Sequence, residues 1–203
     1  MDGTLISQNS WYKLNLALGI TAEEDQEMYD AYGRGDLSYS DWMTKLSSLY
    51  KERGLATKEV IYSSLAEFDL KDGVKDLFLD LQEKKYELVI ISGSFDILVQ
   101  KVAETLNVKH YKANTELEFT NNGYLQNIVS AGDELHEKLR HLEIFCEKLK
   151  IPINQCVCIG DGANDFELFK KTQKGITFTD APKYLKKEAW HVVNNLSDIK
   201  NLL

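Results

Sequence analysis

The chain has 203 residues, which is enough for one full hydrophobic core and a small appended domain. Its 32 acidic against 24 basic residues leave a net charge of −8, which disfavours nucleic acid and acidic membrane surfaces as partners. The sequence shows neither a signal-peptide pattern nor an apolar run near the roughly 18 residues of a membrane span. We therefore expect a cytoplasmic protein that binds neither nucleic acid nor membrane.

Residues 10–66 carry the apolar spacing and the start signals of short helices. Residues suited to cap such helices recur at Thr21, at Ser38 or Ser40, and at Thr57. Gly33 and Gly35 are expected to end the helix that begins after Thr21. Because helices this short are unstable alone, we expect them to pack together as a helical cap over residues 10–68.

Strands and helices alternate in the remainder of the chain. The four consecutive apolar residues from Leu88 to Ile91 are typical of a parallel strand buried on both faces. Residues 113–128 predict a β-hairpin that turns at 121–123. The alternation predicts an α/β fold, with a doubly wound, Rossmann-like, mostly parallel sheet in a core of residues 69–203.

Cysteine and histidine do not predict a metal centre. Three cysteines without a secretory signal indicate reduced thiols: Cys146, Cys156 and Cys158. Cys156 and Cys158 lie two residues apart on a predicted strand and are best interpreted as buried small apolar residues rather than as joint metal ligands. The four histidines show no metal-ligand spacing.

Polar side chains follow two of the predicted strands, at Ser92 and at Asp161. In doubly wound sheets, ligands bind at the carboxyl ends of the strands. Asp161 and Asp165 lie four residues apart on a strand-to-helix turn, and carboxylate oxygens there suit a hard cation such as Mg²⁺. A plain turn with a helix cap is the alternative interpretation of this segment.

Three further candidates are ambiguous when taken singly. Asp2-Gly3 is a common turn dipeptide. Ser92-Gly93 fits either a helix N-cap or a phosphate-binding turn at a helix start. Lys138 lies in a charged helix, where a solvated lysine is the ordinary interpretation.

In chain order, these segments resemble the motifs of the haloacid dehalogenase superfamily, and specifically its phosphoserine-phosphatase-like branch. The matching strings are Met1-Asp-Gly-Thr-Leu, Val89-Ile-Ile-Ser-Gly-Ser-Phe-Asp, Lys138 in its helix, and Gly160-Asp-Gly-Ala-Asn-Asp. The resemblance spans essentially the whole chain, including a helical cap inserted after the first motif. It is specific for the superfamily and less specific for the substrate.

The resemblance implies Mg²⁺-dependent hydrolysis of a small phosphomonoester through an aspartyl-phosphate intermediate. It implies that Asp2 is the general acid and base, and that Lys138 neutralises charge on the phosphoryl group. It assigns phosphate binding to Ser92, Gly93, Lys138 and Asn164. It assigns the metal site to Asp2 through its backbone carbonyl, to Asp161 as a direct ligand, and to Asp165 in support.

The chain departs from the family pattern at its start. The nucleophilic aspartate would lie just upstream of Met1, together with the central strand that delivers it. We therefore expect residues 1–9 to be the remnant of the first core motif and the linker that follows it. We further expect the native protein to carry roughly 6–10 more residues, about one strand, and the chain as written to be inactive.

The sequence does not decide which phosphate ester is the substrate or which reaction is catalysed. The family places a glutamate where Asn9 stands, and a cap arginine at the position of Lys45 or Leu46, so a phosphoserine-like substrate is one possibility. Lys45 or Arg34 could instead meet an anionic substrate. The alternatives to a phosphatase are a phosphotransferase, an inactive relative that binds a phosphorylated ligand or protein partner, and a purely structural α/β domain. The sequence gives no indication of the oligomeric state.

Overall fold

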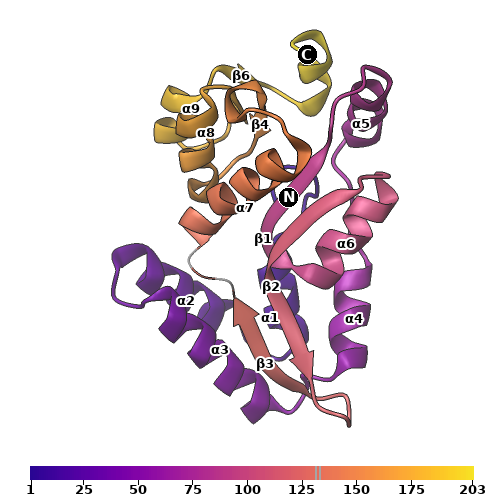
Figure 1. Cartoon of the computed structure of the whole chain (residues 1–203). Coiled ribbons are helices and arrows are strands. Elements are labelled where there is room, and N and C mark those ends of the chain that lie inside the picture. The colour runs from indigo at the N-terminus through magenta and orange to yellow at the C-terminus, as the bar shows by residue number, and fades with distance from the viewer. Residues whose placement is uncertain (131, 133) are drawn as a thin grey trace.

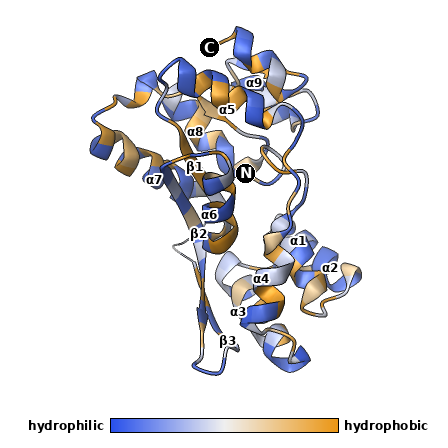
Figure 2. Ribbon diagram, turned by 90° about the vertical axis from the view of Figure 1, so that its right-hand side faces the viewer, coloured by the Kyte–Doolittle hydropathy of each residue, from blue (hydrophilic) through white to orange (hydrophobic). Residues whose placement is uncertain are grey.

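The computed structural model describes residues 1–130, 132 and 134–203. The first part of the chain forms helices α1 (Ser10–Ala17), α2 (Ala22–Arg34), α3 (Tyr39–Arg53) and α4 (Lys58–Ala66). The last part forms α7 (Glu134–Leu149), α8 (Phe166–Thr172) and α9 (Lys183–Glu188). These two groups of helices lie at opposite ends of the molecule (Figures 1 and 2).

The predicted helix starts are confirmed by their caps. The side chains of Thr21, Ser38 and Thr57 each accept a backbone N–H from the first turn of α2, α3 and α4, which satisfies a donor that the helix itself cannot pair. Gly35 ends α2 in the left-handed conformation, at φ 79°. The expectation that Gly33 also stops this helix is wrong, because Gly33 lies inside it.

The first sheet joins β1 (Val89–Phe95), β2 (His110–Phe119) and β3 (Leu125–Ser130) in that order. β1 and β2 are parallel and are connected through α6 (Asp96–Thr105), whereas β2 and β3 form the predicted hairpin. The first strand of the hairpin begins earlier than expected, because His110 pairs with Val89 and the strand continues from there. Backbone hydrogen bonds from Lys58 to Gly123 and from Leu125 to Ala56 join the hairpin to the start of α4.

The second sheet joins β4 (Cys158–Ile159), β5 (Gly175–Phe178) and β6 (His191–Val193), all parallel. α5 (Val74–Glu83) precedes β1 along the chain. Short 3₁₀ turns complete the fold at η1 (Ile153–Gln155), η2 (Ala163–Asp165) and η3 (Leu196–Asn201). None of the helices within the described residues has both the length and the apolar character needed to cross a membrane.

The strands form two sheets rather than the single sheet that the alternation predicts. A cavity of about 440 Å³ lies between them, and β1 and β4 both line it. Its walls are mainly apolar and include Ile90 and Ile91 on one side and Val157 and Ile159 on the other, with Met1 also in the lining.

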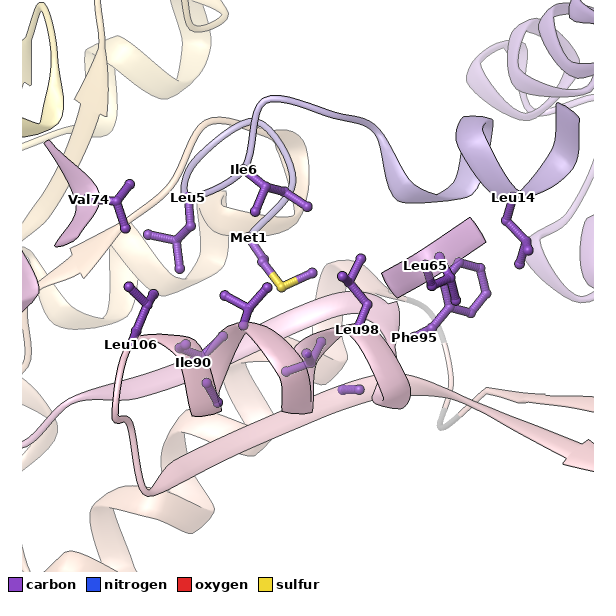
Figure 3. Close-up of a cluster of buried hydrophobic side chains, with 14 of the residues drawn as sticks. Met1, Leu5, Ile6, Leu14, Leu65, Val74, Ile90, Phe95, Leu98 and Leu106 are labelled. Atoms are coloured by element: carbon purple, nitrogen blue, oxygen red, sulfur yellow. The ribbon is translucent and has the colours of Figure 1, made fainter. Parts of the chain in front are cut away.

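The N-terminal residues belong to the main hydrophobic core. Met1, Leu5 and Ile6 are buried in the same cluster as Ile90 and Leu98, and Figure 3 shows these side chains together. Burial of this apolar surface holds residues 1–6 against β1 and α6.

The two segments that lead into and out of helices α1–α4 lie side by side. Ile6 forms an antiparallel bridge with Leu70. Ser7 N–H donates to the carbonyl of Asp69 at 3.1 Å, and Lys71 N–H donates to the carbonyl of Leu5 at 2.9 Å. The helical group is thus attached to the sheets through a short antiparallel ribbon.

Candidate active site

A tight loop at the start of the chain presents Asp2. The N–H groups of Thr4, Leu5 and Ile6 all converge on the carbonyl of Met1, at 3.1, 2.7 and 3.1 Å. Gly3 has φ +70°, a conformation that glycine adopts without strain. Lys71 Nζ donates to the carbonyl of Gly3, so the outgoing half of the ribbon fastens this loop.

The two carboxylate oxygens of Asp2 have different surroundings. Oδ2 accepts the backbone N–H of Ser10 at 2.8 Å and its hydroxyl at 2.5 Å. Oδ1 is buried and has no hydrogen-bond partner within the described part of the chain. A buried acceptor without a partner is costly, so Oδ1 is the oxygen that is available to a ligand.

A row of serines links Asp2 to the end of β1. Ser10 Oγ lies 2.6 Å from Ser94 Oγ, and Ser94 N–H donates to Ser92 Oγ at 3.1 Å. The hydroxyl of Ser10 already donates to Asp2, so the shared hydrogen between the two serine oxygens belongs to Ser94. Ser92 accepts from a backbone N–H through its lone pair, which leaves its own hydrogen available to a ligand.

The start of α1 is attached to this strand end by an aromatic side chain as well. The Trp11 indole N–H donates to the carbonyl of Gly93 at 3.4 Å, and the Trp11 and Phe95 ring centroids lie 4.3 Å apart. Sequence reasoning missed Ser10, Trp11 and Ser94. The sequence offers two weak signals for these residues. Ser10 and Trp11 stand at the start of the first helix, and Ser94 stands two residues after Ser92.

Asp161 follows β4 and contacts the first loop directly. Thr4 Oγ1 donates to Asp161 Oδ1, across 157 residues of sequence. A Cβ added to Gly3 would overlap the Asp161 carboxylate, so the two segments approach as closely as a glycine allows. The first and the last predicted motifs therefore meet.

Asp165 and Lys138 form a buried ion pair beside Asp161. Lys138 Nζ lies 2.7 Å from Asp165 Oδ1 and 2.9 Å from Asn164 Oδ1, and both charged side chains are only 7% exposed. Asp165 Oδ2 accepts the N–H groups of Asp161 and Gly162 at 3.0 and 3.1 Å. Burial opposes ionisation, but Lys138 outweighs it and lowers the pKa of Asp165. Lys138 is therefore not a solvated surface lysine.

The structure brings the main predicted residues together at the carboxyl ends of β1 and β4. Contacts run from Ser92 through two serines to Asp2, then through the first loop to Asp161, Asp165 and Lys138. Among the described residues, no group of three or more His, Cys, Asp and Glu is arranged to hold a metal ion. Both oxygens of Asp165 are already engaged, whereas Asp2 keeps a free one.

The sequence suggests Asn9 and Lys45 as substrate contacts, and the structure places their side chains in other environments. Asn9 is the N-cap of α1, and its side-chain oxygen accepts the N–H of Tyr12 at 3.1 Å. Lys45 is exposed on α3, and its neighbour Leu46 is fully buried. Arg34 pairs with Asp36 at 2.8 Å in a solvated position.

A family model described as a haloacid dehalogenase-like hydrolase matches residues 1–171. The chain belongs to this family. Curated phosphoserine phosphatases are among its relatives, which places it in that branch of the haloacid dehalogenase-like hydrolases. The protein of Archaeoglobus fulgidus is 28% identical over 92% of this chain and 52% of its own length. That of Methanocaldococcus jannaschii is 26% identical over 100% of this chain and 92% of its own length. The Streptomyces coelicolor protein is 28% identical over 100% of this chain and 48% of its own length. The chain thus spans about half of two of these relatives and nearly all of the third.

Solved structures share the fold of this haloacid dehalogenase-like hydrolase. A phosphoserine phosphatase described as a phospho-aspartyl intermediate analogue matches with a TM-score of 0.83 and 24% identity, over 100% of this chain and 95% of that one. A substrate-bound phosphoserine phosphatase complex matches with a TM-score of 0.82 and 23% identity, over the same shares. At these identities, the likeness establishes the fold.

Proposed function

We propose that this protein is a Mg²⁺-dependent phosphatase that hydrolyses a small phosphomonoester through an aspartyl-phosphate. The observation that carries the proposal is the connected set of contacts that joins Asp2, Ser92, Lys138 and Asp161 at one edge of the two sheets. A hydroxyl, an ammonium and carboxylates in one place form the combination that binds and transfers a phosphoryl group.

The surroundings of each residue support its proposed role. Asp2 Oδ2 is occupied by Ser10, so the proton given to the leaving alcohol, and later taken from water, is carried by Oδ1. The free hydrogen of Ser92, with Gly93 beside it, binds a phosphoryl oxygen. Lys138 balances the negative charge that gathers there, and Asn164 lies in contact with it.

Residues of this chain also suit the cation that the family implies. Asp161 and the backbone carbonyl of Asp2 offer the hard oxygen donors that Mg²⁺ prefers, and the Asp161 and Asp2 segments are already in contact. When bound, Mg²⁺ offsets the repulsion between an anionic substrate and an anionic nucleophile. Asp165 holds the backbone of Asp161 and Gly162 in place through its second oxygen.

The nucleophile is proposed to be an aspartate in a segment that precedes Met1. The apolar cavity between β1 and β4 has the two facing strand edges that an inserted parallel strand requires. Met1, whose amino group would become a peptide N–H in a longer chain, is a buried residue. Roughly 6–10 added residues, about one strand, are sufficient to fill the cavity and end beside Asp2.

The helical group is proposed to be a cap over residues 10–68 that opens and closes over a core of residues 69–203. Ser10 and Trp11 support this role, because they connect the first cap helix to the general acid and to the phosphate-binding strand end. A small phosphate ester, phosphoserine-like or not, is the proposed substrate class.

The test is a panel of phosphomonoesters on the protein extended at its N-terminus by its own upstream coding sequence. We expect Mg²⁺-dependent hydrolysis, a loss on the order of 100-fold in Asp161→Asn, and no loss in the exposed-site control Asp30→Asn. The chain starting at Met1 should give no turnover. Full activity of Asp161→Asn, or an upstream stop codon in place of an apolar run ending in Asp, would contradict the proposal. Products formed with an added alcohol distinguish a phosphatase from a phosphotransferase.

A further inference from the structure

A pair of cysteines outside the proposed catalytic residues lies in direct contact. Cys146 is on α7, and Cys156 follows η1 just before β4, ten residues along the chain. Their sulfur atoms are 3.5 Å apart. Both residues are half-buried, so each keeps part of its surface exposed to solvent.

We propose that Cys146 and Cys156 form a peroxide-sensitive thiol pair that oxidises to a disulfide joining α7 to the entry of β4. A disulfide bond is about 2 Å long, so the two sulfur atoms need to approach by only about 1.5 Å. The segment between them includes residues 150–152 and the short turn η1, and this irregular backbone can adjust by that amount. This inference goes beyond the proposed function and does not depend on it.

The third cysteine has a different hydrogen-bond partner. Cys158 is two residues beyond Cys156, but its thiol hydrogen-bonds with Thr172 of α8. Its burial raises the pKa of that thiol to about 12. Cys158 is therefore a matched internal control, with the same chemistry and nearly the same place in the sequence.

The hydrogen bond between the two sulfurs indicates the order of the reaction. The geometry allows either sulfur to donate the hydrogen between them. Burial, and next the hydrogen bond to Cys146, raise the pKa of Cys156 to about 11, so we assign the donor role to Cys156. Cys146 is then the thiol that attacks the hydroperoxide, which breaks the O–O bond and gives a sulfenic acid and one water (or alcohol). The sulfur of Cys156 next displaces the hydroxyl of that sulfenic acid. The S–S bond forms, a water leaves with the proton of Cys156, and two electrons have passed from the thiols to the peroxide.

The disulfide would connect two elements that supply the candidate site. α7 carries Lys138 two turns before Cys146, and β4 leads from Cys156 to Asp161. Oxidation would therefore tie the helix bearing the buried lysine to the strand that precedes the metal-binding turn. The sequence alone does not reveal this contact, because the two cysteines belong to different elements.

The experiment treats the reduced 203-residue chain with hydrogen peroxide, then denatures it and alkylates the remaining thiols. We expect an intact-mass decrease of about 2 Da before alkylation, one remaining alkylatable thiol, and a monomer on a non-reducing gel. A tryptic digest should contain a peptide with Cys146 linked to the peptide that begins at Ile151 and carries Cys156.

Variants then assign the bond. Cys158→Ser should form it as the wild type does, and Cys146→Ser and Cys156→Ser should each lose it. The tryptic peptide from residue 151 to residue 170 carries both Cys156 and Cys158, so fragmentation of the linked wild-type peptide assigns the bond to one of them. This assignment does not depend on how well the variants fold. A bond that involves Cys158, a bond between two chains, or three thiols that all remain alkylatable would each overturn the proposal.

Discussion

Replacing Lys138 by methionine is expected to destabilise the protein strongly, because it leaves the carboxylate of Asp165 buried without its counter-ion. The two side chains are each 7% exposed, and Nζ lies 2.7 Å from Oδ1. Asp165 Oδ2 would keep its two backbone N–H donors, whereas Oδ1 would lose the only partner identified for it in the described structure. Methionine keeps most of the length and volume of lysine, so the loss is mainly electrostatic.

Breaking a buried ion pair on one side typically costs about 3–5 kcal/mol. We expect the lower end of this range, about 3 kcal/mol, because Asp165 Oδ2 keeps its two backbone N–H donors. For a chain of this size, this corresponds to a fall of about 6–12 °C in the midpoint of thermal unfolding. Because the pKa of Asp165 is lowered in the folded protein, its ion pair stabilises the fold above about pH 4. That stabilisation is lost as the pH falls through the folded-state pKa, so the difference between wild type and variant should narrow in acid.

Urea unfolding followed by circular dichroism measures the free energies, with Lys171→Met as the matched control. Lys171 pairs with Glu143 at 3.5 Å, and both of these side chains are 50% exposed, so the control should change stability by less than about 1 kcal/mol. The double variant Lys138→Met/Asp165→Asn should recover part of the loss, since it removes the unpaired charge. Equal unfolding midpoints for Lys138→Met and Lys171→Met would refute the reasoning, as would a double variant less stable than the single one.

Two further substitutions test the fold. Burial raises the pKa of Asp96, and its Oδ1 has no hydrogen-bond partner in the described structure. The contribution of Asp96 to stability is therefore greatest below the pKa of this side chain in the unfolded chain. That contribution is lost as the pH rises through the pKa in the folded protein. Asp96→Asn should therefore raise the unfolding midpoint at pH 7, and an unchanged or larger gain at pH 3 would contradict this. Gly175→Ala should cost about 1–3 kcal/mol in urea unfolding, because a Cβ there overlaps the ring of Phe169. The matched control Gly33→Ala has open space in a helix and should be neutral or stabilising by up to about 1 kcal/mol; similar midpoints for these two variants would count against the packing.

The features that the sequence predicts well are those set by nearby residues. Thr21, Ser38 and Thr57 lie directly before the helices that they cap, so their roles follow from short segments. Asp161 follows an apolar strand as predicted, whereas Ser92 lies inside β1, which continues to Phe95 instead of ending before the serine. The rule for parallel sheets predicts that ligands bind at the carboxyl ends of these strands. Contacts of Ser92 and Asp161 with their neighbours in the structure agree with that expectation.

The features that the sequence does not predict depend on contacts between distant residues. The ambiguity of Lys138 is resolved only when α7 packs against η2 and buries the lysine beside Asp165. The serine row requires α1 to meet the end of β1, and no periodicity in the chain indicates that meeting. Pairing of His110 with Val89 extended the first hairpin strand for the same reason.

The paired linkers at Ile6 and Leu70 restrict how the helical group can move. A single flexible connection would let α1–α4 rotate freely, but two segments joined by backbone hydrogen bonds resist twisting about their common axis. Bending across the ribbon is the motion that breaks the fewest of these bonds. Opening would therefore follow one arc, along which Ser10 leaves Ser94 and Trp11 leaves Gly93 in the same movement. Asp2, the proposed general acid, would lose its link to the proposed phosphate-binding segment of β1 whenever the helices swing away, and would regain it when they return.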